Sequence, residues 1–244
     1  MAPVAPVAVV DRRWSVGQNV DMTDDRGAEV VLEHIMTTRA MRRFTDAPVD
    51  DAVILECLRA AQQAPSGGNV QPQQYLVVTA PEARARVGHW YGRAYHRYEA
   101  SLADPAEFRS DDDRRSWERT RDASRHLADN MADVPVLVLF LQPKIAWGSE
   151  DAEGPLDIGR LDASVYPAVQ NFCLAARAYG LGTALTTVIR VYTAEVLDEL
   201  GVPADRYEIA ALVPVGYPIG RFGVARRKPV EAVTHWNWFG DRRR

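Results

Sequence analysis

Two arginines stand three positions apart, just after a helix-like stretch of the chain. Apolar residues recur at spacings of three and four from residue 29 to residue 38, which predicts a helix. Arg39 and Arg42 follow at its end, and on a helical turn such a pair faces one ligand. Guanidinium groups match phosphate oxygens in charge and shape, so the pair suits a phosphorylated ligand. The alternative is a solvated basic helix end.

A glycine-rich loop follows the next expected helix, in which Asp50 is the N-cap of an apolar run over residues 53–61. The run ends in Ala-Pro-Ser-Gly-Gly-Asn at residues 64–69. Two glycines let a backbone approach a planar ring closely, while Ser66 and Asn69 offer hydrogen bonds to its polar edge. The pattern favours a ligand loop, and the alternative is a plain helix-to-strand turn.

A third candidate segment lies late in the chain, where Leu185, Thr186 and Thr187 occupy the expected end of a strand. Arg227 follows, directly before a Lys-Pro pair. Taken singly, these are ordinary strand-forming threonines and an ordinary surface arginine. They gain meaning only in combination with the two earlier segments.

Other chemistries lack their usual signatures. The Gly-Leu-Gly run at 180–182 has no third glycine and precedes a strand, unlike a dinucleotide-binding loop. Ser66 lacks the context of a nucleophile elbow, and the sequence has no P-loop. The five histidines form no HxxxH pair, so we expect no metal site. Cys57 and Cys173 form no CxxC motif and are predicted to be buried, reduced thiols.

The three segments together resemble the FMN-dependent nitroreductase family. The similarity includes Arg-x-x-Arg, A-P-S-G-G-N-x-Q-P, G-L-G-T-A-L-T-T and the late R-R-K-P, and extends from about residue 30 to about residue 235. It implies an α+β fold with a central mixed sheet flanked by helices. It also implies an intertwined homodimer with FMN at each subunit interface and NADPH or NADH as reductant.

The resemblance also implies roles for individual residues. Arg39 and Arg42, together with Arg227, would hold the phosphate and ribityl end of FMN. Ala40 and Met41 lie between them as further cofactor-binding residues. Many members have Arg-Arg-Ser at 38–40, whereas this chain has Thr-Arg-Ala, so backbone contacts are expected at 38 and 40.

The remaining implied contacts surround the flavin ring. Ser66, Gly67 and Asn69 would line the isoalloxazine, partly from the partner subunit, and Gly68 would be the substrate-side residue. A second group would pass the pyrimidine edge of the ring: Leu185, Thr186 and Thr187. No catalytic side chain and no metal are expected, since the flavin itself would carry the chemistry.

The implied activity is hydride transfer from NAD(P)H through the flavin to a nitroaromatic, a quinone or a similar electron-poor acceptor. Two alternatives stay open: a flavin-dependent oxidase or dehydrogenase of a specialised metabolite, and a flavin-binding protein without turnover. The R-R-K-P tail is similar to iodotyrosine-deiodinase-like members, but their Glu/Tyr/Lys lid triad has no convincing counterpart at 93–133.

Strands and helices alternate along the chain. The predicted strands cover 75–79, 135–141, 183–189 and 209–215, and the second is apolar on both faces, which indicates a central strand. Three more helices are expected, one from Pro81, one over 164–179 ending at Gly180, and one over 194–200. The alternation predicts an α/β or α+β protein.

Composition limits the remaining function classes. The chain has 244 residues, 47% of them hydrophobic, and a formal net charge of −4. That charge argues against a nucleic-acid binder held by a general basic field. No apolar run approaches the roughly 20 residues that span a bilayer, and the reduced thiols favour a cytoplasmic enzyme.

The domain organisation follows from the same patterns. Residues 1–27 are expected to form a flexible arm, because they lack the charge order of a secretory signal, and 28–244 to form one domain. The charged run at 107–125 is interpreted as a solvated helix face, or alternatively as part of a lid over 93–133. The tail holds Trp236 and Trp238 and is expected to embrace the partner subunit.

Overall fold

Four antiparallel strands form the centre of the protein in a computed structural model, which describes residues 25–102, 108–145 and 148–243. Their order across the sheet is β1 (Gln74–Val78), β2 (Val136–Pro143), β6 (Tyr207–Gly216) and β5 (Gly182–Thr183). Ala40 adds an isolated parallel bridge to Thr183, so the sheet is mixed. β2 has a partner on each side, which confirms the central strand that its apolar pattern predicted.

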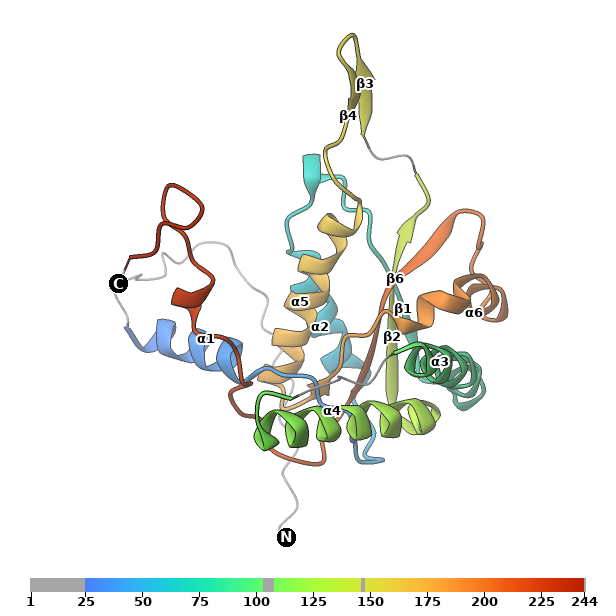
Figure 1. Ribbon diagram of the computed structural model, residues 1–244. Coiled ribbons are helices and arrows are strands. Elements are labelled where there is room, and N and C mark those ends of the chain that lie inside the picture. Colours follow the sequence, from blue (N-terminus) through green and yellow to red (C-terminus); the bar gives the residue numbers. More distant parts are fainter. Residues whose placement is uncertain (1–24, 103–107, 146–147, 244) are drawn as a thin grey trace.

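Helices cover both faces of this sheet, as Figure 1 shows. One face carries α2 (Asp51–Gln62) and α5 (Asp162–Ala178); the other carries α3 (Pro81–Ser101), α4 (Asp111–Asp129) and α6 (Thr193–Glu199). Alternate β2 side chains divide between two cores, with Val138 and Phe140 under α5 and Leu137 and Leu139 under α3. Burying each such side chain is worth about 1.5–3 kcal/mol. The expected α+β class is confirmed.

Smaller elements complete the chain. α1 (Asp25–Thr37) lies beside the C-terminal part of α5, and the hairpin of β3 (Ser149–Asp151) and β4 (Gly154–Leu156) projects away from the sheet (Figure 1). The described part of the chain also contains four short 3-10 helices: η1 (Gly67–Asn69), η2 (Met131–Asp133), η3 (Val188–Tyr192) and η4 (Val230–Ala232). Residues 1–24 of the expected arm lie outside the described residues, and positions 25–27 are already helical.

The predicted continuous strand over 183–189 is wrong. Only Gly182–Thr183 pairs with β6 as a strand, and Thr186 then makes a separate bridge to Leu212 in the same register. Between these two contacts the register places Pro214 at the position that would donate toward β5. Proline has no N–H, so the ladder is interrupted there, and η3 begins soon afterwards.

Several local predictions are confirmed. The Asp50 side chain accepts a hydrogen bond from the Ala52 N–H at 2.8 Å and caps α2. Gly180 follows α5 with a φ of 75°, the left-handed conformation that favours glycine at a helix end. Both cysteines are free and buried; burial, more than the nearby Cys173 and Glu56, raises the pKa of Cys57 to about 12.

Candidate functional site

The segment with the two arginines is extended, because α1 ends at Thr37 before it reaches them. The backbone N–H of Met41 donates to the carbonyl of Thr183 at 2.8 Å, which holds this segment along the edge of the sheet. The predicted helical turn is therefore wrong. Arg39 and Arg42 lie outside any helix, on either side of the bridge at Ala40, with Arg39 exposed and Arg42 half-buried.

A glycine lets this segment pack directly on β5. An added Cβ at Gly182 would lie 2.9 Å from the Cβ atoms of both Met41 and Pro218, closer than packed carbon atoms approach. The Met41 side chain is buried in this contact, whereas Ala40 is exposed. Met41 thus anchors the segment through its side chain and its N–H, and only its backbone carbonyl is left to meet a ligand.

Helix α3 adds a residue that sequence reasoning missed. Tyr91 is only 3% exposed, and its hydroxyl donates to Thr186 Oγ1 at 3.3 Å. Burial raises the pKa of Tyr91, while the bond to Thr186 and the nearby positive charge of Arg42 oppose that rise. Tyr91 and Thr186 are thus in direct contact, and Arg42 lies near enough for its charge to act on Tyr91, so residues of three separate segments share one region. The sequence marks Tyr91 only as an apolar position of the helix, so its polar role had no signal.

The threonine segment is held mainly by its backbone. Thr186 both donates to and accepts from the backbone of Leu212, each at 2.9 Å. Leu185 is 43% exposed beside it, and Thr187 precedes η3. The bond between Met41 and Thr183 places the segments of Arg42 and Thr186 side by side, as expected for two parts of one site.

Left-handed backbone occurs at two positions of the loop at 66–69 and again shortly after it. The φ angles of Gly68, Asn69 and Gln71 are 57°, 55° and 46°. This conformation costs an ordinary side chain such as glutamine about 1–2 kcal/mol. The Gly67 N–H donates to Ser164 Oγ, in the first turn of α5, at 3.1 Å. The loop is thus fixed at the N-terminal end of α5.

Within one chain, this loop and the arginine segment are far apart. Arg177, near the other end of α5, donates to Thr37 Oγ1 at 3.2 Å, immediately before the arginines. Thirteen helical steps from Ser164 to Arg177 amount to about 20 Å. The loop also lies on the α5 side of the sheet, whereas α3, the helix that carries Tyr91, covers the opposite face (Figure 1). A single chain therefore divides the predicted site residues into two groups.

The C-terminal tail places Arg227 near α4. Arg227 Nη1 donates to the carbonyl of Arg226, and Arg226 pairs with Asp113 of α4 at 3.1 Å. Further along, Trp238 is 79% and Phe239 is 95% exposed. The tail aromatics, predicted to need a partner surface, are therefore not covered by their own chain.

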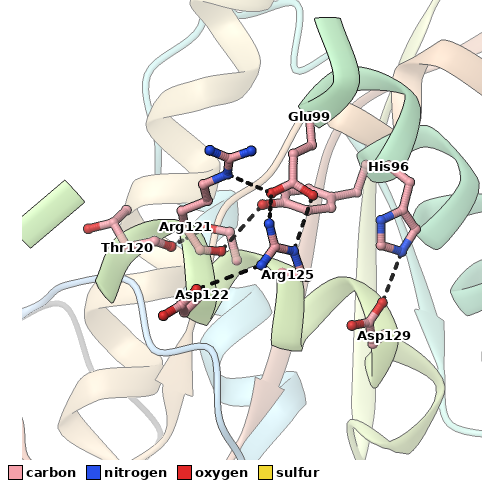
Figure 2. Close-up of polar contacts among 9 residues, drawn as sticks. His96, Glu99, Thr120, Arg121, Asp122, Arg125 and Asp129 are labelled. Atoms are coloured by element: carbon pink, nitrogen blue, oxygen red, sulfur yellow. Dashed lines mark hydrogen bonds and ion pairs between the residues drawn. The ribbon is translucent and has the colours of Figure 1, made fainter. Parts of the chain in front are cut away.

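Helices α3 and α4 are tied together by charge, as Figure 2 shows. Glu99 of α3 accepts from Arg121 Nε at 3.0 Å and from Arg125 Nη2 at 2.8 Å. Chiefly through its bond to Arg125, this pairing lowers the pKa of Glu99. The first part of α4, residues 111–122, is largely exposed, as the solvated-face interpretation of 107–125 expected, whereas its last turns are partly or fully buried. That the 93–133 region acts as a lid remains a prediction.

Comparisons with known proteins identify the family. The model of the nitroreductase family matches residues 35–217, three quarters of the chain, and the protein belongs to that family. Iodotyrosine deiodinase of Drosophila melanogaster is 27% identical over 212 residues, which are 83% of this chain and 66% of the fly enzyme. An FMN reductase [NAD(P)H] of Bacillus subtilis is 25% identical over 84% of this chain and 72% of its own length.

Solved structures share the fold. A crystal structure of iodotyrosine deiodinase bound to FMN and 3-iodo-L-tyrosine aligns with a TM-score of 0.67 and 21% identity. The alignment covers 86% of this chain and all of that one. The described helices include none that is long and apolar enough to cross a membrane.

Proposed function

We propose that this protein is an FMN-dependent oxidoreductase that uses NADPH or NADH to reduce a nitroaromatic, a quinone or a similar electron-poor acceptor. The observation that carries the proposal is the pairing of the arginine segment with Thr183, which places a cation-bearing segment beside the hydroxyl groups of Tyr91 and Thr186 at the edge of the sheet. Membership of the nitroreductase family supports it, as do relatives named for FMN and NAD(P)H.

The residues present suit FMN by the chemistry of their donors. Arg42 and Arg39 supply guanidinium groups for a phosphate, with Arg227 as a third on the tail. Thr186 supplies a hydroxyl for the polar edge of a ring, and the exposed backbone of Ala40 supplies further hydrogen-bonding groups. Bound FMN would accept a hydride from reduced nicotinamide and deliver it to the acceptor. The side chains bind and orient, and none is assigned as acid or base.

We further propose that each flavin lies between two copies of the chain. The loop at 66–69 lies on the α5 side of the sheet and the helix that carries Tyr91 covers the opposite face, so the loop of a second copy would complete the site. Exposed apolar side chains on α1 and the tail support this assembly: Leu32, Ile35, Met36, Trp238 and Phe239. Large exposed apolar patches mark association surfaces.

The decisive experiment is anaerobic reduction of the purified protein. We expect a yellow homodimer by light scattering that releases about one FMN per chain on denaturation. NADPH or NADH should bleach the flavin absorbance, and a nitroaromatic or quinone should restore it. A colourless protein that does not bind added FMN would refute the proposal, and bound flavin that neither nicotinamide reduces would refute the reductase activity.

A further inference from the structure

One glutamine at the end of α2 joins the loop to the neighbouring strand. Gln62 Nε2 donates to Gln71 Oε1 at 3.0 Å. Gln62 Oε1 accepts from Tyr75 Oη at 3.0 Å and from Gln73 Nε2 at 3.3 Å. A single amide thus contacts three residues on the far side of the loop. The buried face of α2, which includes Ile54, Cys57 and Ala61, packs in the core that α2 shares with α5, so the amide is attached to a firmly packed helix.

The bonds of Gln62 meet the loop where its backbone is least favourable. Gln71 has a φ of 46°, in the left-handed region where a non-glycine residue is uncommon. Its N–H donates to Ser66 Oγ at 3.0 Å, and its Nε2 donates to Asn69 Oδ1 at 3.2 Å. Because Gln62 also donates to its Oε1, Gln71 is hydrogen-bonded through its backbone N–H, its side-chain Oε1 and its side-chain Nε2. Such a conformation persists only where the surroundings over-determine it.

We propose that Gln62 is a positioning residue for the flavin site. It does not touch the cofactor; it holds Gln71 in the left-handed conformation, and Gln71 in turn orders Ser66 and Asn69. This inference rests on the proposed function, because Ser66, Gly67 and Asn69 are the residues proposed to line the flavin ring. The conformation of that loop would thus depend on a side chain outside it, that of Gln62 at the end of α2.

The proposal predicts a local effect on the loop. Without the Gln62 amide, Gln71 loses the partner of its carbonyl oxygen, and the loop can relax toward ordinary backbone angles. Contacts at the ring should weaken, while the packed strands should be unaffected because α2 keeps its apolar face. FMN and riboflavin share the ring, so both should lose affinity equally.

The test combines hydrogen exchange of the full-length apoprotein with flavin titration by fluorescence. In Gln62→Leu, the amides of Asn69, Val70 and Gln71 should exchange about tenfold faster, the factor that corresponds to losing roughly 1.4 kcal/mol of local hydrogen bonding. Affinity for both FMN and riboflavin should fall by a similar factor. Gln62→Glu keeps the acceptor for Tyr75 but loses the donor to Gln71. Its exchange rates and flavin affinities should therefore lie between those of the wild type and those of Gln62→Leu.

Gln63→Leu is the matched control, since Gln63 is the exposed neighbour that caps α2 through its backbone N–H. It should leave both measurements unchanged. Unaltered exchange at 69–71 in Gln62→Leu would overturn the proposal, and so would equal acceleration in β2, which reports global destabilisation. If the wild-type protein binds neither flavin, the proposed function fails, whereas the exchange result still decides whether Gln62 orders the loop.

Discussion

The hydroxyl of Tyr91 donates to Thr186 Oγ1, and the same oxygen accepts from the Val188 N–H at 3.4 Å. A hydroxyl has one proton and two lone pairs, so these two bonds occupy both acceptor positions of Thr186. Its own proton is left for a ligand. We therefore expect Thr186 to act as a hydrogen-bond donor toward the proposed flavin, whose pyrimidine edge carries acceptors.

Tyr91→Phe should weaken this contact while keeping the ring that stacks on Tyr95 at 6.5 Å. Losing one neutral hydrogen bond, about 0.5–1.5 kcal/mol, should reduce flavin affinity by roughly two- to tenfold. Because Thr186 is proposed to meet the ring, FMN and riboflavin should be affected alike in a fluorescence titration. A loss confined to FMN would instead place Tyr91 at the phosphate.

Arg42→Ala, unlike Tyr91→Phe, should weaken the binding of FMN much more than the binding of riboflavin. Hydrogen bonds to charged groups contribute about 1.5–3 kcal/mol, so affinity for FMN should fall by about ten- to a hundredfold. Riboflavin has no phosphate and should bind nearly as before. Arg42→Lys should recover part of the loss, because an ammonium keeps the charge without the planar fork.

Arg227→Ala tests the second phosphate contact in the same titration, with the same expected selectivity. The exposed Arg119 of α4 supplies the control, and Arg119→Ala should leave both affinities unchanged. Equal losses of FMN and riboflavin in the Arg42 or Arg227 variant would mean that the arginine supports the fold or the ring.

Gly182→Ala should destabilise the protein by forcing the arginine segment away from β5. The added methyl group would overlap Met41 and Pro218, and such overpacking costs about 1–3 kcal/mol. For a chain of this size, that lowers Tm by roughly 2–12 °C in a thermal scan. Gly223→Ala is the control, since an added Cβ there meets nothing within 4 Å. Equal Tm values for the two variants would contradict the predicted overlap.

The Glu99 cluster should make stability depend on acid. The folded-state pKa of Glu99 is lowered, chiefly by its bond to Arg125, so pairing stabilises the protein above the ordinary carboxyl pKa. The contribution is lost as pH falls through the folded-state value. Urea unfolding should be measured from pH 7 to about pH 3. At pH 7 Glu99→Gln should have a lower free energy of unfolding than the wild type, and this difference should shrink as the pH falls. A constant gap would exclude the ionised pair as its cause.

Local sequence rules predicted those parts of the fold that depend on near neighbours. Asp50 caps α2 because its own side chain reaches an N–H two residues on, and β2 is central because both of its faces are apolar. Family resemblance located the Arg42 and Thr186 segments, and the structure brings these two together. The sequence did not predict the positions of the individual side chains within the site.

The predictions that proved wrong concern segments whose structure depends on residues far away in the sequence. Nothing within 183–189 reveals that Pro214, on another strand, lacks the N–H needed to continue the pairing. Arg39 and Arg42 leave the helix because Thr183 competes for the backbone of Met41. Two adjacent threonines at 37–38, which bond back to carbonyls one turn earlier, were the local hint that the helix ends there.

The separation of the loop from the arginine segment has a genetic consequence. If each flavin uses the arginines of one chain and the loop of the other, damage to the two groups falls on different sites when two variants assemble. A dimer of an Arg42→Ala chain and a chain altered at Gly68 would hold one doubly defective site and one intact site. Co-expression of two inactive alleles would then restore activity by intragenic complementation, whereas two alleles altered within the same group would not.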